Sequence, residues 1–500
     1  MVRIMKKKII VFMTIIYTLF ALTSCSFITI NTAKENGEGG VNGDLSGGEN
    51  SGGIYPEGVY PVEDKYDEYL AKAEAAVAAL PDHRFENQSF TVAVTPEIQF
   101  APNDYSSEYN VALAKRNSMV ADRYSISLGQ IEAPADLMLS DAYASYLSGI
   151  YYSDVMMIPA GKLGEFASKD FLLNVFSLPY ADYYKDCYDL KGMTQASAGD
   201  TSYAVMGDMT RDIGSYYCLY ANTDLLSRLG IEVPYSAVED GSWSWDTVLE
   251  MTRQAMSVDG TVLKIGASTI SDLVGGVYKS SGQNYMSTWL GATPKVAYDT
   301  SLTEKVTRVI ADLRTGDKIL FDQYSNTGSS LGDFRNGNLM FYVGTVSQMS
   351  DICKMGGGWT LLPMPKTDPA QEDYISRLSS SAPIMVVSAS NPYPEDLPYV
   401  LDALGAASGH YLTEAYYRDL IYNSLNNSKT LDMLDYVTGI KGGRGAYDFV
   451  DMFGVSYPEL KENTASVIWS CAISGTDLSS AASAAHYSLN WRMQNDFPAR

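Results

Sequence analysis

The chain has 500 residues, of which 46% are hydrophobic and 19% charged, so it can bury a large core in two or more lobes. Acidic residues outnumber basic residues by 59 to 36, and the formal net charge is −23. Binding to nucleic acid requires cations that neutralise phosphates, so this balance argues against a nucleic-acid-binding protein. Such a charge is typical of a soluble surface.

The amino terminus has the layout of a secretory signal. Arg3 and the cluster Lys6-Lys7-Lys8 precede an apolar stretch that ends in "LTSC" at residues 22–25. This stretch is shorter than the roughly 20 apolar residues that cross a bilayer. Its end resembles the lipobox of bacterial lipoproteins, which implies cleavage after residue 24 and a lipid on Cys25. An ordinary signal or an anchor helix is the alternative. Cleavage would leave 32 basic against 59 acidic residues.

A flexible tether and a helix are predicted next. Residues 25–60 are rich in Gly, Asn, Ser and Glu, a composition that cannot bury enough apolar surface to fold. Residues 61–84 contain "EDKYDEYLAKAEAAVAAL", a run of helix-forming residues that stops at Pro81. We therefore expect a globular domain that is lipid-anchored at the extracellular face of a bacterial cytoplasmic membrane.

From residue 85 onward, short apolar strands alternate with helical segments. "SFTVAVTPEI" alternates apolar and polar residues, and residues 107–124 have helical spacing. Residues 153–179 and 216–234 each contain a strand followed by a helix, and further short strands precede a mostly helical region at 401–500. This alternation predicts parallel α/β sheets. The sequence has no internal repeat and no apolar span of ~18 residues after the signal.

Four segments in a fixed order carry a resemblance to a known family. They are "SDVMMIPAGKLGEFASKDFLLNV", "LYANTDLLSRLGIEVP" with "GSWSWDTVLEMTRQA", "FRNGNLMFYVG" and "GGWTLLPMPKTD". Together they resemble the extracellular solute-binding proteins of ABC importers, in particular the large family of sugar and oligosaccharide binders that includes the maltodextrin-binding proteins. The resemblance covers nearly the whole chain from about residue 85.

The resemblance implies a two-lobed α/β fold of the periplasmic-binding-protein kind, type II. The first lobe would comprise residues 85–205 and 364–405, and the second residues 206–363 and 406–500. Crossing segments would lie near residues 203–220, 359–365 and 406–411, with the ligand cleft between the lobes. By this resemblance we expect a monomer without a cofactor, which delivers a small polar ligand, a saccharide, to a membrane permease.

The family's ligand-facing loops fall at five places in this sequence. They lie at residues 95–97, 158–162, 214–216, 271–272 and 344–345. The candidate ligand-binding residues that these loops supply are Glu97, Lys162, Ser215, Tyr216, Asp272, Gly344 and Thr345. Such side chains suit sugar hydroxyls, and we expect them to grip a saccharide from both lobes.

Aromatic residues are the point at which the sequence departs from the family. Maltodextrin-type members have tryptophans at the positions of Ile158 and Val346, which are aliphatic here. Tyr216, Trp289 or Trp359 could stack on a sugar ring instead. Trp243, Trp245, Trp469 and Trp491 are interpreted as packing residues.

Three other classes remain open alternatives: a peptide-binding receptor, a lipid-anchored surface hydrolase, and an inert surface lipoprotein or adhesin. "GSSLG" at 328–332 matches the nucleophile pattern G-x-S-x-G around Ser330, with His410 and His486 downstream, but a polar loop precedes it where a buried strand is required. The histidines have no metal-binding spacing, so no metal is expected. Cys187, Cys218, Cys353 and Cys471 could form disulfides or act as small buried hydrophobes.

Overall fold

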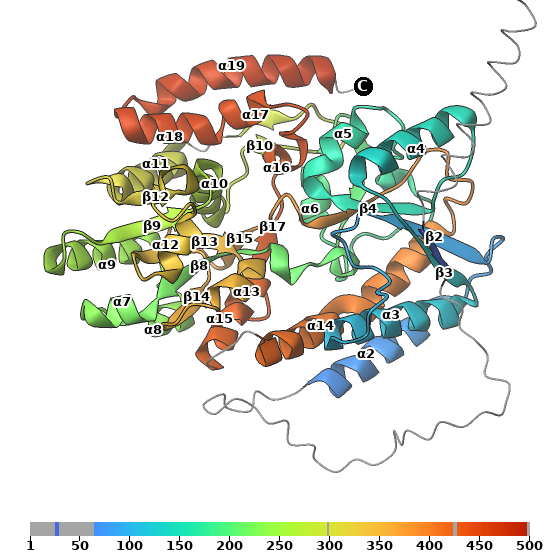
Figure 1. Ribbon diagram of the computed structural model, residues 1–500. Helices are drawn as coiled ribbons and strands as arrows, with labels where there is room; N and C mark the ends of the chain where they lie inside the picture. The colour runs from blue at the N-terminus through green and yellow to red at the C-terminus, as the bar shows by residue number, and fades with distance from the viewer. Residues whose placement is uncertain (1–25, 30–64, 298–299, 424–427, 498–500) are drawn as a thin grey trace, which may run out of the picture.

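The computed structural model describes residues 26–29, 65–297, 300–423 and 428–497. Cys25, the predicted signal at 1–24 and residues 30–60 of the predicted tether lie outside the described residues. The described chain forms two halves that lie side by side, each built around its own sheet (Figure 1). Among these residues, no helix combines the length and the apolar character that crossing a bilayer requires.

The first half contains a six-stranded sheet. Its order is β1 (Ser26–Thr29), β3 (Ser127–Glu132), β2 (Ser89–Val94), β4 (Val155–Pro159), β16 (Pro383–Val386) and β7 (Ala204–Val205). Strand β2 pairs in parallel with β3 and β4, whereas β16 is antiparallel to both β4 and β7. Strand β1 falls within the predicted tether. Its Phe-Ile-Thr sequence favours a strand, and it pairs antiparallel with β3.

The helices of the first half include a long helix near the carboxyl end of the chain. They are α2 (Tyr66–Ala78), α3 (Glu108–Tyr124), α4 (Ala135–Ser148), α5 (Leu163–Ala167), α6 (Leu190–Gln195) and α14 (Leu397–Asn423). Helix α14 kinks at Gly409 yet stays packed on α2 and α3. The hydroxyls of Tyr411 and Tyr66 lie 3.0 Å apart, and Asp419 accepts from the backbone N–H of Glu108 at 2.9 Å. Residues 406–423 therefore pack on the first half, although the sequence assigned them to the second lobe.

The second half contains a five-stranded sheet. Its order is β12 (Ile319–Phe321), β9 (Leu263–Ala267), β13 (Leu339–Thr345), β8 (Tyr217–Asn222) and β14 (Trp359–Leu362). Strand β9 is parallel to β12 and β13, and β8 is antiparallel to β13 and β14. The larger helices here are α9 (Trp245–Val258), α10 (Ile270–Ser280), α11 (Thr300–Arg314), α15 (Ser428–Thr438), α18 (Ala465–Ser474) and α19 (Leu478–Asp496).

Short elements complete both halves. The short helices are α7 (Thr223–Arg228), α8 (Tyr235–Glu239), α12 (Ser330–Arg335), α13 (Met349–Ile352), α16 (Phe449–Phe453) and α17 (Glu459–Glu462). Two-stranded pairs are formed by β5 (Ser197–Ala198) with β6 (Thr201–Ser202), β10 (Met286–Ser287) with β11 (Lys295–Val296), and β15 (Tyr374–Arg377) with β17 (Gly443–Ala446).

The second crossing between the halves occurs later in the chain than the expected 359–365. The backbone N–H of Lys366 donates to Trp243 at 3.1 Å, and β15 pairs with β17, so residues up to 377 remain on the second half. The chain reaches β16 through residues 378–382. These backbone hydrogen bonds, which no local pattern reveals, fix the position of the crossing.

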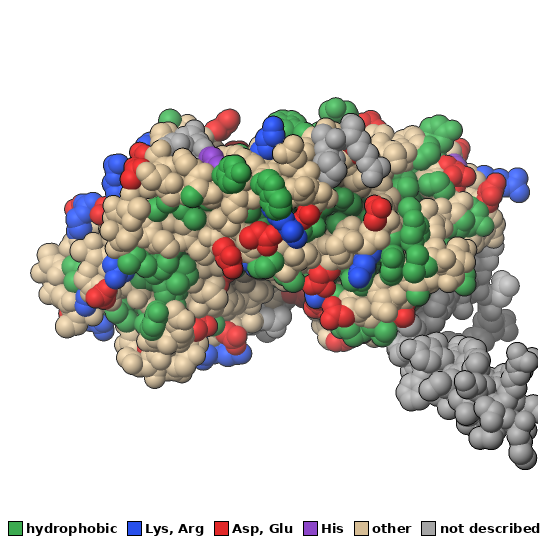
Figure 2. Space-filling view, turned by 90° about the horizontal axis from the view of Figure 1, so that it is seen from above, with side chains coloured by type: hydrophobic (Ala, Val, Ile, Leu, Met, Phe, Trp, Pro, Cys, Tyr) green, Lys and Arg blue, Asp and Glu red, His purple; other side chains and the backbone are tan. Residues whose placement is uncertain are grey.

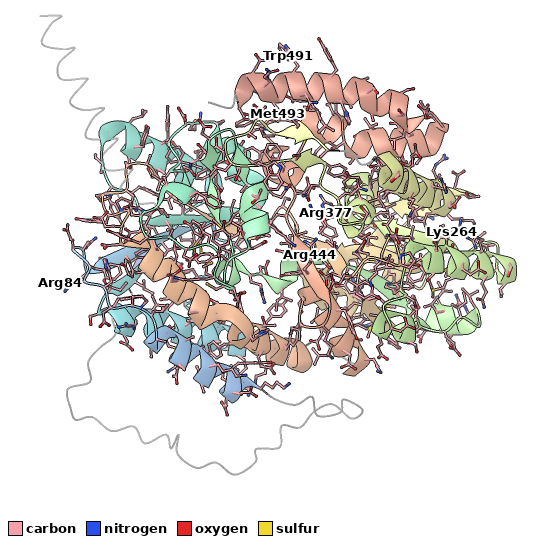
Figure 3. All side chains as sticks on the ribbon, turned by 180° about the vertical axis from the view of Figure 1, so that it is seen from behind. Arg84, Lys264, Arg377, Arg444, Trp491 and Met493 are labelled. Atoms are coloured by element: carbon pink, nitrogen blue, oxygen red, sulfur yellow. The ribbon has the colours of Figure 1, made fainter. Side chains whose placement is uncertain are left out.

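The burial of the tryptophans and the state of the cysteines can be compared with the predictions. Trp243 and Trp245 are buried, as predicted, whereas Trp491 is exposed on α19 (Figure 3), so its interpretation as a packing residue is wrong. Among the described residues, Cys187, Cys218, Cys353 and Cys471 are free thiols. Burial raises the pKa of Cys218 to about 12, which keeps this thiol neutral and makes it a small hydrophobe.

Candidate ligand-binding cleft

Two adjoining cavities lie between the halves. They have volumes of about 270 and 670 Å³, and they share five lining residues: Asp189, Lys191, Arg444, Gly445 and Tyr447. The first half contributes residues 186–195, and the second half contributes residues 439–447. Figure 2 shows an outline that is indented between the two halves, with acidic and basic side chains scattered over both. We call the two cavities together the cleft, the smaller one the inner cavity and the larger one the outer cavity.

The inner cavity is lined by half-buried carboxylates from the first crossing segment, residues 206–216. This segment contains two 3-10 turns, η3 (Asp208–Thr210) and η4 (Ile213–Ser215). Asp208 forms an ion pair with Arg211 at 2.7 Å, and Asp212 accepts from the backbone N–H of Gly214 at 3.0 Å. Burial raises the pKa of both carboxyls. The inner cavity therefore presents hydrogen-bonding groups that are already oriented by their neighbours.

Asp189 lies where the two cavities meet. It caps α6, because its Oδ1 accepts from the backbone N–H of Gly192 at 2.9 Å. Burial raises the pKa of Asp189, and the nearby cations Arg444 and Lys191 partly oppose that shift. Figure 3 shows Arg444 in the space between the two halves. One carboxylate and two cations thus surround the middle of the cleft.

The outer cavity combines a buried ion pair with an exposed aromatic ring. Lys279 and Asp448 lie 3.1 Å apart, and both side chains are only 3% exposed. Trp289 lines the same cavity and is 67% exposed. Of the three aromatic residues proposed for stacking, Tyr216 lines the inner cavity and Trp289 the outer one, whereas Trp359 is buried in the second sheet.

Most residues predicted from the family's loops lie elsewhere. Glu97 lines a separate cavity of about 200 Å³, which shares Arg211 and Asp212 with the inner cavity. Lys162 forms ion pairs with Asp136 at 3.0 Å and Glu165 at 3.1 Å. Tyr216 is the predicted residue that lines the cleft itself.

The remaining predicted residues make local contacts. Ser215 is buried and donates to Asp212. Asp272 closes the first turn of α10 with Thr269 and accepts from the Tyr217 hydroxyl at 2.6 Å. The hydroxyls of Thr345 and Ser347 lie 2.8 Å apart.

Gly344 lies in β13 and is packed closely by its neighbours. A Cβ at this position would lie 2.4 Å from the side chain of Gln348 and 2.5 Å from that of Tyr342. Glycine is therefore explained by packing here.

Helix α16 is the reason why the predicted loops do not form one site. On one side it packs on η1 (Ala160–Lys162), the first-half loop that was expected to meet ligand. On the other side, Asp451 of α16 binds Arg377, whose guanidinium donates to the Ser271 carbonyl at 3.1 Å. The helix therefore lies between the predicted loops at 158–162 and 271–272.

Sequence reasoning missed the residues that line the cleft. Asp189, Arg444 and Tyr447 lie outside every family segment that guided the prediction. Arg211 and Asp212 fall in the predicted crossing segment 203–220 but were not chosen as ligand-binding residues. One available signal was "GIKGGRGAY" at 439–447, a glycine-rich loop that carries an arginine and ends in an aromatic residue.

The comparisons with known proteins identify the family. Residues 147–396, half of the chain, match the model of the bacterial extracellular solute-binding proteins. The chain belongs to this family. No curated protein matches the sequence.

Solved structures with the same fold include three sugar-binding proteins. The cyclic α-maltosyl-1,6-maltose binding protein of Arthrobacter globiformis is 13% identical with a TM-score of 0.56, over 81% of this chain and 99% of that one. The sugar-binding protein of Xanthomonas citri is 12% identical with a TM-score of 0.56, over 81% and 98%. The galacto-N-biose-/lacto-N-biose I-binding protein of a Bifidobacterium longum ABC transporter is 12% identical with a TM-score of 0.54, over 83% and 99%. The predicted two-lobed α/β fold is confirmed.

Ser330 of this solute-binding protein is a structural residue. Its buried hydroxyl is 2.9 Å from the Ala267 carbonyl and 2.7 Å from Oδ1 of Asp322. It begins α12, whereas His410 stacks on Tyr69 in the first half. The G-x-S-x-G match therefore places a buried hydroxyl, and not an exposed nucleophile, at the start of a helix. No cluster of three His, Cys, Asp or Glu side chains in the described part of the chain could hold a metal ion.

Proposed function

We propose that this protein is the membrane-anchored receptor of an ABC importer, which captures a small polar ligand, a saccharide, and delivers it to a permease. The observation that carries the proposal is the shared lining of the cleft: Asp189 and Lys191 come from the first half, and Arg444 and Tyr447 from the second. A ligand that touches both halves binds best when they are close together. It would therefore shift an open–closed equilibrium towards the closed form, which a permease can recognise.

The chemistry of the cleft supports a saccharide. Carboxylates, amides and cations can exchange hydrogen bonds with hydroxyl groups, and the rings of Tyr216 and Trp289 offer apolar faces for the C–H side of a sugar ring. The three structural relatives are themselves saccharide- or sugar-binding proteins. A peptide receptor remains the alternative that the binding test must separate.

A panel of saccharides and short peptides tests the ligand class. Thermal unfolding should shift upward with a saccharide, because a ligand that binds only the folded state adds RT ln(1 + [L]/Kd) to stability. Small-angle scattering should show a smaller radius of gyration at saturation. Stabilisation by peptides alone, or a saccharide complex with no compaction, would contradict the proposal.

The lipid anchor is tested separately on Cys25. Replacement of this residue by alanine should prevent lipid attachment and leave the protein in the medium or as an unprocessed precursor. Cys218→Ala is a matched control, because that buried thiol belongs to the folded domain. Unchanged membrane fractionation and normal processing of Cys25→Ala would show that another segment holds the protein at the membrane.

A further inference from the structure

Building on the proposed saccharide receptor, we propose that its ligand carries one singly charged anionic group, a carboxylate or a sulfate, which Lys191 and Arg444 bind from opposite lobes. Both cations line both cavities, so they lie along the path that joins the inner and outer parts of the cleft. Lys191 belongs to α6 of the first half, and Arg444 to β17 of the second. An anion between them would contact both halves at once.

Neither of these two cations has a close ion-pair partner among the described residues. The carboxylate paired with Arg444 is that of Asp373, whose Oδ2 is 3.8 Å from Nε, and both side chains are partly exposed. Lys191 is exposed and forms no ion pair with the described residues. A planar guanidinium that is free to form two parallel hydrogen bonds suits a carboxylate or a sulfate.

Two other cations of the cleft already have partners. Lys279 is paired with Asp448, and Arg211 with Asp208. Asp189 lies beside Lys191 and Arg444, but it is one carboxylate against two cations, and one of its oxygens caps α6. Asp186 and Asp212 also line the inner cavity, so the positive charge that can meet an anion is confined to Lys191 and Arg444, where the two cavities join. Two cations at one place suit one singly charged group better than a doubly charged phosphate ester.

The charge of the whole protein makes the position of these two cations significant. With a net charge of −23, the molecule repels anions at long range, and a neutral sugar would need no cations to offset that repulsion. Trp289 lines the outer cavity beside Met286 and can receive a sugar ring while the charged group reaches Lys191 and Arg444. The expected ligand is therefore an acidic oligosaccharide, such as one that contains a uronic acid or a sulfated sugar.

Calorimetry with matched disaccharides tests this inference. The probes are β-1,4-glucosyl, α-1,4-glucosyl and α-1,4-galactosyl disaccharides, each as the neutral sugar, the uronate and the 6-sulfate. At least one acidic form should bind tenfold or more tightly than its neutral parent, and its affinity should fall as salt is raised. The affinities of the uronate and the 6-sulfate, compared with each other, show which anion is recognised.

Charge-removing variants identify the residues responsible. Arg444→Gln and Lys191→Gln should each raise Kd for the acidic form about tenfold to a hundredfold, with the neutral parent unaffected. Arg253→Gln is the control, because Arg253 lies on α9 and pairs with Glu250 outside the cleft. Unchanged melting temperatures would confirm that the variants fold.

The outcomes separate this inference from the proposed function. Neutral sugars that bind as tightly as every acidic counterpart would overturn the inference and leave the saccharide receptor in place. Acidic binding that both variants leave unchanged would also overturn it. If peptides bind and no disaccharide does in any form, both the inference and the saccharide receptor fail.

Discussion

The ion pair between Arg377 and Asp451 gives the sharpest prediction for stability. Nε of Arg377 donates to Oδ2 of Asp451 at 2.8 Å, and the two residues are 7% and 8% exposed. Burial disfavours the charged guanidinium, but Asp451 more than compensates, so the pKa of Arg377 lies well above its usual value. Asp451→Ala would leave this cation buried without its main partner. Such a loss costs about 3–5 kcal/mol.

The surroundings of Arg377 place the expected cost at the lower end of that range. The Asp272 carboxylate remains 3.7 Å from the guanidinium, and the Ser271 carbonyl still accepts from it. We therefore expect Asp451→Ala to lower the free energy of unfolding by about 3 kcal/mol, more than a hundredfold in the unfolding equilibrium. Urea denaturation followed by circular dichroism measures this as a lower midpoint.

Two further variants decide whether the reasoning holds. The double variant Arg377→Met with Asp451→Leu removes both charges and should recover most of the lost stability, because a buried pair can be replaced by apolar residues at little cost. Glu239→Ala breaks an exposed ion pair with Lys429 and should leave the midpoint nearly unchanged. If Asp451→Ala behaves like Glu239→Ala, or if the double variant is as unstable as the single one, the account of this ion pair is wrong.

Three other predictions follow from single residues. Burial raises the pKa of Asp154, so the contribution of this residue to stability is present at low pH, where it is protonated, and is lost as the pH rises through the raised pKa. Asp154→Asn should therefore increase the melting temperature at pH 8 but not at pH 4. An equal increase at both pH values would contradict this pH dependence. Ser330→Ala should lower stability by about 1–3 kcal/mol in urea denaturation, because the polar partners of its buried hydroxyl lose their donor, and an unchanged midpoint would refute that role. Trp289→Ala should weaken saccharide binding in calorimetry at an unchanged melting temperature, since the ring is exposed; unaltered affinity would remove it from the site.

The sequence allowed the family and fold to be predicted because their signals are local. The alternation in "SFTVAV" gives β2, and the two buried tryptophans that flank the start of α9 were identified as core residues. The position of the cleft depends on long-range contacts instead. Arg377 and Asp451 are 74 residues apart, and "FVDMF" reads as an ordinary apolar helix until its place between the halves is known.

The division of the chain between the lobes was missed for a related reason. Helix α14 contains apolar and aromatic residues on both sides of residue 406, and its hydrophobic pattern does not reveal which half it covers. Its contacts with α2 and α3 become visible only in three dimensions. Tyr411 and Tyr66, for example, are 345 residues apart in the chain.

Strand β16 sets the order in which the two central sheets can be completed. It lies between β4 and β7, and Met385 pairs with Val205, about 180 residues earlier in the chain. All five strands of the second sheet, by contrast, lie within residues 217–362. As the chain emerges amino end first, the second sheet is complete while β4 and β7 still have unpaired edges, which invite aggregation until β16 arrives. The sheet that begins first in the sequence therefore closes last, and the loop entropy of this insertion slows its completion.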